Sequence, residues 1–305
     1  MSVAAPMSVV VAPIAGRRDC LENCLRSLVA QDGAPELDIV VPYDETIRHV
    51  TELAAAFPRV RFIPAPGLDT AAARRGASRE HHDTLRAIGI GQATGAIVVL
   101  TEDHARVAPD WCRELAAALE RHPTAAAVGG AVECGSAVPL NRAVWCCDFG
   151  RYGNPLPEGP APYVSDSNVA YRRQALERVR TAWERDYRET VVHWALRQAG
   201  YAVCLTPRAV AWQERRDLTL WAALRERYVW GRSFAFARVQ TVGPLRRAVY
   251  AAAAPALPVL LTFRLARTLQ QRGRLRGFLS VFPLVLLLHA AWALGEFTGY
   301  ATGKA

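Results

Sequence analysis

The sequence lacks the cysteine spacing of a disulfide framework or of a zinc site. It has seven cysteines, an odd number, and no pair of them encloses two residues. Small secreted domains carry even sets of cysteines, and structural zinc sites use closely spaced cysteine pairs. The pattern therefore predicts reduced thiols and a cytoplasmic setting.

A secretion signal is also missing from the opening residues. Residues 1–16 contain no basic stretch, and their apolar run has only the length of a strand. A signal peptide needs a basic region followed by a longer apolar one. We expect this segment to form the first strand, with Met7 as an alternative start.

Acidic residues are nearly absent from the last part of the chain. After Ala235 there are eight arginines, Lys304 and one acid, Glu296, which together give +8 of the formal net charge of +9. A nucleic-acid-binding face would place basic charge within the folded domain, whereas these arginines flank apolar segments. The distribution favours a membrane surface with anionic lipid as a partner and argues against nucleic acid.

The composition excludes a disordered chain. Hydrophobic residues make up 51% and charged residues 21% of the 305 residues, which is enough to form a packed core. A chain of this length predicts a core domain with an appendage. We place the core domain at 1–235 and a membrane-associating helical tail at 236–305.

Strand and helix patterns alternate through the first half of the chain. Strands are expected at 7–14, 37–43, 59–65, 96–101 and 125–133, and helices at 18–31, 46–56, 79–95 and 110–122. This alternation predicts a mainly parallel, doubly wound sheet. Gly95 is expected to cap the helix before it. The Gly/Pro-rich stretch 149–163 is expected to be a long functional loop.

Three charged or titratable residues, Glu102, Asp103 and His104, follow directly after the apolar strand at 96–101. Charges beside a buried strand are costly unless they bind something. In open α/β sheets, ligands bind beyond the carboxyl ends of the strands. The tripeptide therefore predicts a ligand site, with a solvated turn or a helix-capping cluster as the alternative.

Four segments, taken in order, resemble the family 2 glycosyltransferases. They are SVVVAPIAGRRDCLENCLRSLVAQ (8–31), RAIGIGQATGAIVVLTED (86–103), SDSNVAYRRQAL (165–176) and RETVVHWALRQAGY (188–201). The resemblance extends over roughly residues 1–235. It implies a GT-A fold, which is an α/β fold with helices on both faces of the sheet. It also implies transfer of a sugar from a nucleotide-sugar donor, for which we expect UDP as the nucleotide.

The family binds a divalent metal with a D-x-D motif at the end of this strand, and the metal bridges the donor phosphates. The resemblance places Glu102 at the first acidic position and His104 at the last. An imidazole ligand favours Mn²⁺ over Mg²⁺. Asp103 takes the place of His104 if the register shifts by one residue.

The resemblance also implies donor contacts from Pro13, Asp44 and Arg86. Pro13 follows the opening strand. Asp44 corresponds to acids that contact the nucleotide base or ribose, with a turn-forming aspartate as the alternative. Arg86 is expected to contact a phosphate or the acidic motif, with a surface salt bridge as the alternative.

Glu189 takes the second position of the family's acidic pair, where the general base lies, although Arg188 replaces the first acid. A base that deprotonates the acceptor hydroxyl implies inversion at the sugar. The alternative is a glutamate favoured at a helix start by the helix dipole. Acceptor-side candidates are Asp166, Asn168 and Arg172. Phosphate-clamp candidates are Arg225 and Arg232.

Two sequence signals of related activities are absent. The stretch WQERRD (212–217) does not match the Q-x-x-R-W signature of processive synthases, so we expect addition of a single sugar. The stretch APIAGRRD (12–19) lacks the glycine-rich, lysine-bearing loop of a nucleotidyltransferase. That activity stays an alternative, as does an inactive membrane scaffold, which the departures at D-x-D and at the acidic pair favour.

The tail contains two uncharged segments. Gly277–Gly295 has 19 residues, which as a helix would reach about 28 Å and span a bilayer. Ala248–Phe263 is shorter and holds two prolines, and a connector with five arginines follows it. Keeping that connector cytoplasmic makes the first segment interfacial or re-entrant. We expect a lipid or lipid-linked acceptor at the cytoplasmic face. The alternative is a pair of buried helices at the contact of a homo-oligomer.

Overall fold

The computed structural model describes residues 6–14, 17–44, 48–68, 80–216, 218–239 and 242–303. These residues form two compact units. The first holds the described residues of 6–68, 80–135 and 152–215, and the second holds those of 136–151 and 216–303. The predicted domain boundary at 235 falls inside the helix Leu220–Val239. The whole of this helix belongs to the second unit.

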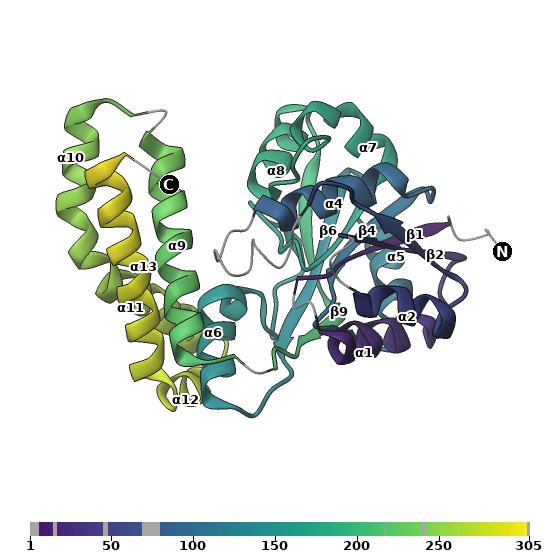
Figure 1. Cartoon of the computed structure of the whole chain (residues 1–305), viewed down its shortest axis with the longest axis horizontal. Coiled ribbons are helices and arrows are strands. Elements are labelled where there is room, and N and C mark those ends of the chain that lie inside the picture. The colour runs from purple at the N-terminus through teal and green to yellow at the C-terminus, as the bar shows by residue number, and fades with distance from the viewer. Residues whose placement is uncertain are drawn as a thin grey trace. The chain divides into compact units, whose positions relative to one another are not determined.

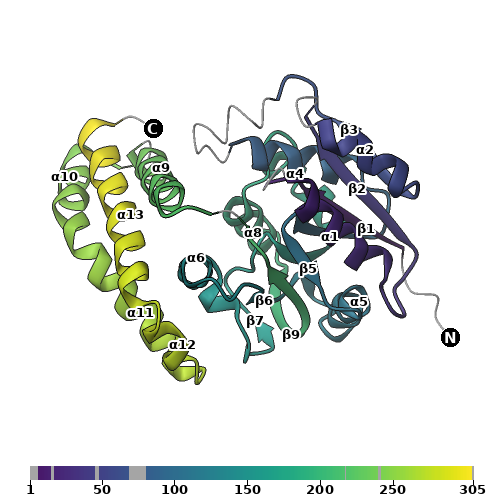
Figure 2. The same cartoon turned by 60° about the horizontal axis from the view of Figure 1, so that its bottom comes forward.

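The first unit is built on one mixed sheet (Figures 1 and 2). Its strands are β1 Met7–Ala12, β2 Leu37–Tyr43, β3 Val60–Pro64, β4 Ile97–Glu102, β5 Ala105–Val107, β6 Ala125–Cys134, β7 Gly159–Pro160, β8 Asn168–Arg172 and β9 Ala202–Gln213. The order across the sheet is β3-β2-β1-β4-β8-β6-β9-β5, and β7 pairs with β9.

The sheet is parallel on the side formed by the N-terminal strands. β1 runs parallel to both β2 and β4, and β2 runs parallel to β3. β8 is antiparallel to β4 and β6, whereas β6 and β9 are parallel. The predicted α/β sheet is thus confirmed. Near the centre of the sheet, β8 runs antiparallel to both of its neighbours, β4 and β6.

Helices of the first unit cover both faces of the sheet (Figure 1). They are α1 Arg18–Val29, α2 Arg48–Ala56, α4 Glu80–Gln92, α5 Trp111–Arg121, α7 Arg173–Arg178 and α8 Glu189–Gln198, with the 3-10 turn η2 Arg180–Ala182. A second 3-10 turn, η1 Gly150–Tyr152, lies at the boundary between the two units. The helices predicted at 18–31, 46–56, 79–95 and 110–122 correspond to α1, α2, α4 and α5.

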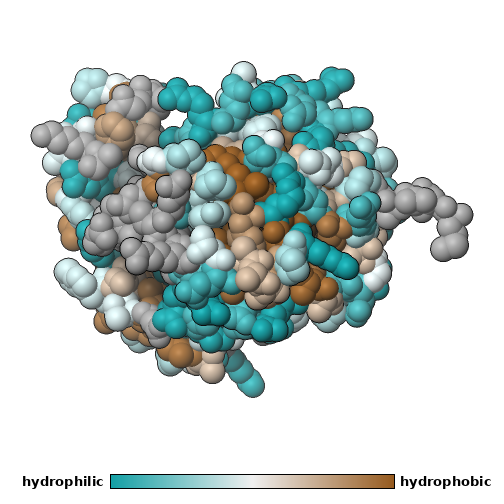
Figure 3. All heavy atoms as spheres, turned by 45° about the vertical axis from the view of Figure 1, so that its right-hand side comes forward, coloured by the Kyte–Doolittle hydropathy of each residue, from teal (hydrophilic) through white to brown (hydrophobic). Residues whose placement is uncertain are grey.

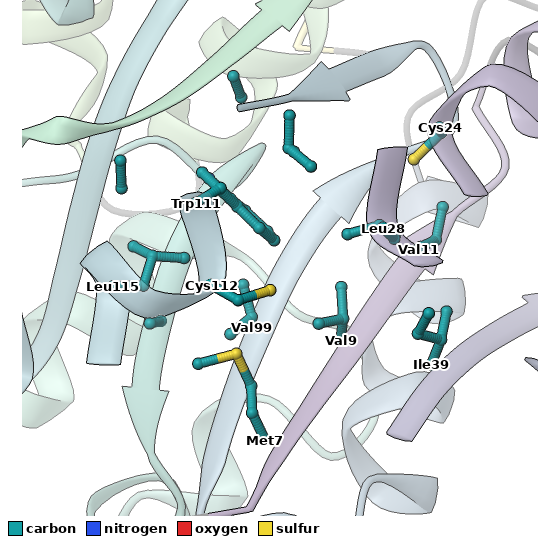
Figure 4. Packing of buried hydrophobic residues seen from close by; sticks show 14 of the residues in the cluster. Met7, Val9, Val11, Cys24, Leu28, Ile39, Val99, Trp111, Cys112 and Leu115 are labelled. Atoms are coloured by element: carbon teal, nitrogen blue, oxygen red, sulfur yellow. The ribbon is translucent and has the colours of Figure 1, made fainter. Parts of the chain in front are cut away.

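The alternation of side chains along β1 decides which helices it contacts. Met7, Val9 and Val11 join the core with the leucines of α1 and with Trp111 of α5 (Figure 4). On the opposite face, Val10 lies against α4, where a Cβ added to Gly89 would meet the Val10 side chain at 2.2 Å. Successive strand residues point to opposite faces, so one strand holds helices on both sides.

Gly95 has a different role from the predicted helix cap. α4 ends at Gln92, and the Gly95 amide donates to Ser8 Oγ over 2.8 Å. A Cβ at Gly95 would lie 2.6 Å from the Ser8 backbone nitrogen. The glycine is therefore required by the close approach of the chain to the start of β1.

The second unit is helical. Its elements are α6 Pro139–Phe149, α9 Leu220–Val239, α10 Pro244–Ala253, η3 Ala254–Ala256, α11 Leu257–Gln271, α12 Leu275–Leu279 and α13 Phe282–Thr302. α6 was not predicted, since its sequence lies next to the Gly/Pro-rich stretch. It joins the tail helices through a bidentate ion pair in which Arg227 donates to both carboxylate oxygens of Asp148 over 2.5 Å.

α9 and α13 pack closely along a seam of small residues. A Cβ at Gly231 would lie 2.2 Å from the Trp292 carbonyl oxygen, and one at Gly295 would lie 2.1 Å from that of Tyr228. Gly299 meets the Cβ of Ala235 in the same way, at 2.7 Å. Small residues that bring two helix backbones together are typical of membrane helices, although soluble helices also use them.

Two helical stretches of the second unit are long and apolar enough to cross a membrane by length and composition, Pro244–Gln271 and Phe282–Thr302. The predicted spanning segment at 277–295 differs from the second of these, because residues 275–279 form the separate helix α12. Many large hydrophobic side chains are exposed on these helices: Leu245, Val249, Val259, Leu260, Phe263, Leu279, Phe282, Leu287, Leu294 and Phe297.

Candidate active site

The end of β4 carries the three residues singled out in the sequence. In the parallel register Glu102 lies beside Ala12 of β1, and the Asp103 amide donates to the Ala12 carbonyl over 3.0 Å. Asp103 Oδ1 in turn accepts from the Ile14 amide over 3.0 Å, and its side chain is fully buried. Asp103 therefore holds the loop after β1 in place, and its predicted replacement of His104 as a metal ligand stays a prediction.

His104 lies between the two acids. Its Nδ1 is 3.2 Å from Asp103 Oδ1, and its Nε2 is 3.4 Å from Glu102 Oε2. Both ring nitrogens of His104 therefore face a carboxylate oxygen.

Two ligand atoms bound to one cation at about 2.1 Å would lie about 3.0 Å apart in an octahedron and about 3.4 Å apart in a tetrahedron. The separation of Glu102 Oε2 and His104 Nε2 fits this range. In the described part of the chain, no group of three or more His, Cys, Asp or Glu side chains could hold a metal ion. A metal at this position would therefore have two protein ligands and would need the remaining ones from a bound molecule or water.

Arg86 connects the end of β4 with the segment before β8. Its side chain is 1% exposed, and its NH2 group lies 2.7 Å from Glu102 Oε1 and 3.0 Å from Asp166 Oδ2. Burial alone would lower the pKa of Arg86, but the carboxylates of Asp166, Glu102 and Asp83 outweigh it and raise that pKa. Arg86 is thus a fixed positive charge between two acids that belong to different segments.

Glu189 is the first residue of α8, and its carboxylate reaches the segment before β8. The Asp166 amide donates to Glu189 Oε2 over 3.3 Å. Asp166 is also the partner of Arg86. A continuous line of polar and charged groups therefore runs from His104 through Glu102, Arg86 and Asp166 to Glu189.

A buried cluster of three rings supports the start of α8. The Tyr171 hydroxyl lies 2.6 Å from that of Tyr187 and 2.8 Å from His193 Nε2. Burial lowers the pKa of His193 to about 4, against a smaller opposing effect of Asp166, so this imidazole is neutral at pH 7. Burial also raises the pKa of Tyr187 well above its usual value. The cluster joins β8, the chain before α8, and α8 itself one turn beyond Glu189.

Pro13 and Asp44 lie where the sequence predicted, directly after β1 and β2. Both are buried, and both strands end at the same edge of the sheet as β4, because β1 is parallel to each of them. Their predicted contacts with the donor stay predictions.

Asn168 and Arg172 are used by the fold. The Asn168 amide accepts from Trp111 Nε1 over 2.9 Å and donates to the carbonyls of Ala131 and Ala209.

Arg172 pairs with Ile97 at the start of β4, about 16 Å along the strand from Glu102. Its guanidinium donates to the Ala125 and Leu119 carbonyls. The structure therefore does not bring Arg172 to the other site residues, and Asn168 has its donors and acceptor occupied by the core.

The model of the glycosyl transferase family 2 matches residues 9–180, which is more than half of the 305 residues. The chain belongs to this family. The matched residues include Glu102, His104, Arg86 and Asp166, whereas Glu189 lies nine positions beyond them. The protein is a glycosyltransferase with a GT-A fold, as the sequence predicted.

Solved structures similar to this glycosyltransferase share little sequence identity with it. The mannosyltransferase PcManGT from Pyrobaculum calidifontis, in complex with GDP-Man and Mn²⁺, is 19% identical, with 95% of this chain and 87% of that chain covered and a TM-score of 0.49. S. aureus TarS 1–349, in complex with UDP-GlcNAc, is 13% identical, with 98% and 92% covered and a TM-score of 0.51. No curated protein matches the chain significantly.

Two residues of the glycosyltransferase site were not predicted. Gln213 Nε2 donates to Glu102 Oε2 over 3.2 Å from the end of β9, and Asp83 lies 3.6 Å from Arg86 NH1. Asp83 precedes Arg86 by three residues on a predicted helix, so helical spacing could have indicated it. Gln213 comes from a strand far along the chain, and no local signal marks it.

Arg225 and Arg232 lie on α9 in the second unit of the glycosyltransferase. Arg225 is exposed and Arg232 is half-buried. Their predicted closure over the diphosphate stays a prediction.

Proposed function

We propose that this glycosyltransferase transfers one sugar from a nucleotide-sugar donor to a lipid or lipid-linked acceptor, with inversion at the anomeric carbon. The observation that carries this proposal is the placement of Arg86 between Glu102 and Asp166. It joins the donor-side residues at the end of β4 with Glu189 in one constellation beyond the parallel strands, where α/β sheets bind their ligands.

On the donor side, Glu102 and His104 are the residues that would hold a divalent metal. Their ligand atoms have a suitable separation, and the imidazole favours Mn²⁺ over Mg²⁺. Such a metal, when bound, would neutralise charge on the leaving diphosphate. Arg86 and Gln213 would keep the Glu102 carboxylate in a fixed orientation through their hydrogen bonds to its two oxygens. We take UDP as the nucleotide to test first.

On the acceptor side, Glu189 acts as the general base. Its carboxylate takes the proton of the acceptor hydroxyl as that oxygen attacks the anomeric carbon. The bond between this carbon and the diphosphate oxygen breaks, and the nucleoside diphosphate leaves with the electron pair. Attack from the face opposite the leaving group inverts the anomeric configuration.

The helical second unit supports a lipid or lipid-linked acceptor and a position at the cytoplasmic face of the membrane. Residues 244–295 hold seven arginines and no acid, and their helices expose large apolar side chains. Arginines beside exposed apolar residues suit an anionic bilayer surface.

The experiment that tests the proposed reaction is product analysis with a panel of UDP-sugars and GDP-mannose, each with Mn²⁺ or Mg²⁺. We expect at least one donor to raise the melting temperature, since a ligand of the native state stabilises it by mass action. The same donor should release a nucleoside diphosphate. Release of a nucleoside monophosphate or of pyrophosphate would instead indicate a nucleotidyltransferase. Absence of both stabilisation and turnover would favour the inactive scaffold.

A further inference from the structure

An aromatic pair, Trp194 and Tyr163, lies on the surface of the first unit. Among its described residues only three large hydrophobic side chains are exposed, Val29, Val191 and Trp194. Two of these, Val191 and Trp194, belong to α8, the helix that begins with Glu189. Trp194 is 55% exposed. A large exposed ring beside a site of chemistry is a feature of binding surfaces.

The Trp194 ring is held in a defined orientation. Its Nε1 donates to the Tyr163 hydroxyl over 2.7 Å. The Tyr163 ring lies 6.4 Å, centroid to centroid, from the buried ring of His193. Since the single polar atom of the indole already has a partner, the exposed part of Trp194 is ring carbon.

The pair adjoins the acceptor side of the site. Tyr163 precedes Asp166 by three residues, and Trp194 lies about 7.5 Å beyond Glu189 along the axis of α8. Asp166 and Glu189 are themselves joined by a hydrogen bond of 3.3 Å. Five residues also turn the helix by about 140°, so an acceptor that contacts both Glu189 and this pair has to be longer than the reacting group and curve around α8.

We propose that Trp194 and Tyr163 form an acceptor subsite that stacks against a sugar ring of a saccharide-bearing acceptor. This inference rests on the proposed function. A sugar ring presents C–H groups on its faces and hydroxyls around its rim, which matches an aromatic face with polar neighbours. Thr190 and Arg197 are exposed on the same helix and supply such neighbours. An acyl chain could not form hydrogen bonds with these polar neighbours. The large exposed apolar surface that an acyl chain would need lies on the second unit.

The test uses octyl β-glucoside, octyl β-galactoside, octyl β-maltoside and octyl β-lactoside as probes. Octyl tetraethylene glycol ether has the chain without the sugar and serves as the lipid probe. Binding is followed by saturation-transfer NMR, and turnover by nucleotide release with and without glycoside. The variants are Trp194→Ala, Trp194→Phe and Tyr163→Phe. Trp221→Ala is the matched control, since this tryptophan is 76% exposed on the second unit.

We expect at least one glycoside to bind through its ring protons, and Trp194→Ala to weaken that binding by about tenfold or more, as loss of an aromatic contact does. Trp194→Phe should restore part of the affinity, and transfer should fall relative to hydrolysis in Trp194→Ala. Equal affinity of wild type and Trp194→Ala, equal binding of the sugar-free ether, or binding of no glycoside would overturn the subsite. Absence of nucleotide release from every donor would instead refute the proposed function, because the NMR measurement needs no turnover.

Discussion

Replacing Arg86 by methionine should destabilise the first unit strongly and in a pH-dependent way. Methionine keeps much of the side-chain volume but leaves the carboxylates of Glu102 and Asp166 buried without the charge that joins them. Removing one partner of a buried ion pair costs about 3–5 kcal/mol. For a unit of this size, each kcal/mol lowers the melting temperature by about 2–4 °C, which gives a decrease of about 6–20 °C.

The pH dependence follows from the same geometry. Without Arg86, protonation of the two buried carboxyl groups removes the unpaired charge, so the loss of stability relative to the wild type should shrink as the pH falls from 8 to 5. Differential scanning calorimetry at the two pH values, without donor, measures both effects. Arg26→Met is the control, since Arg26 pairs with Glu22 on an exposed helix face and should change stability by about 0.5 kcal/mol or less. A melting temperature of Arg86→Met equal to that of the wild type, or a loss that does not shrink at pH 5, would refute the reasoning.

Two other substitutions test further parts of the structure. The pKa of His193 is lowered to about 4 in the folded chain by burial, so the unfolded chain binds more protons between pH 4 and 6.5. His193 should therefore contribute a fall of about 3 kcal/mol in the free energy of unfolding as the pH drops through this window. Urea titrations should show that His193→Gln reduces the pH dependence by this amount, and an unchanged pH dependence would contradict a buried neutral imidazole. In the second unit, Gly295→Ala places a Cβ 2.1 Å from the Tyr228 carbonyl oxygen and should destabilise the packing of α9 on α13 by about 1–3 kcal/mol, measured by limited proteolysis in urea. Gly277→Ala, where no atom lies within 4 Å of the added Cβ, is its control, and equal cleavage of the two variants would argue against the close seam.

Much of the fold could be predicted from the sequence, because the local spacing of apolar residues indicates where strands and helices form. The strands at β1, β2, β3, β4 and β6 and the helices between them follow from apolar spacing. The ligand site that the charges at the end of β4 indicated stays a prediction. Figure 3 shows a molecular face that is mainly hydrophilic with hydrophobic side chains near its centre, and such grouping of side chains is not visible in the one-dimensional pattern.

What could not be predicted depends on pairing between distant segments. Arg172 was expected at the acceptor side, but the antiparallel register of β8 on β4 puts it beside Ile97, at the other end of the strand. Asn168 was expected to contact the acceptor, but its side-chain amide accepts a hydrogen bond from Trp111 Nε1 and donates to two backbone carbonyls of the core. The link from Arg86 to Asp166 joins residues 80 positions apart in the chain, and the grouping of α6 with the tail depends on Arg227 and Asp148.

We propose that one continuous set of polar and charged groups serves both donor binding and acceptor activation, with Glu189 as the base. Binding and turnover of the same nucleotide sugar in Mn²⁺ should be compared for wild type and Glu189→Gln, with Glu120→Gln, at an exposed residue of α5, as the control. We expect Glu189→Gln to bind the donor as the wild type does and to turn it over about 10²–10⁴ times more slowly, which is the usual contribution of a general base. Turnover by Glu189→Gln at the wild-type rate would contradict it.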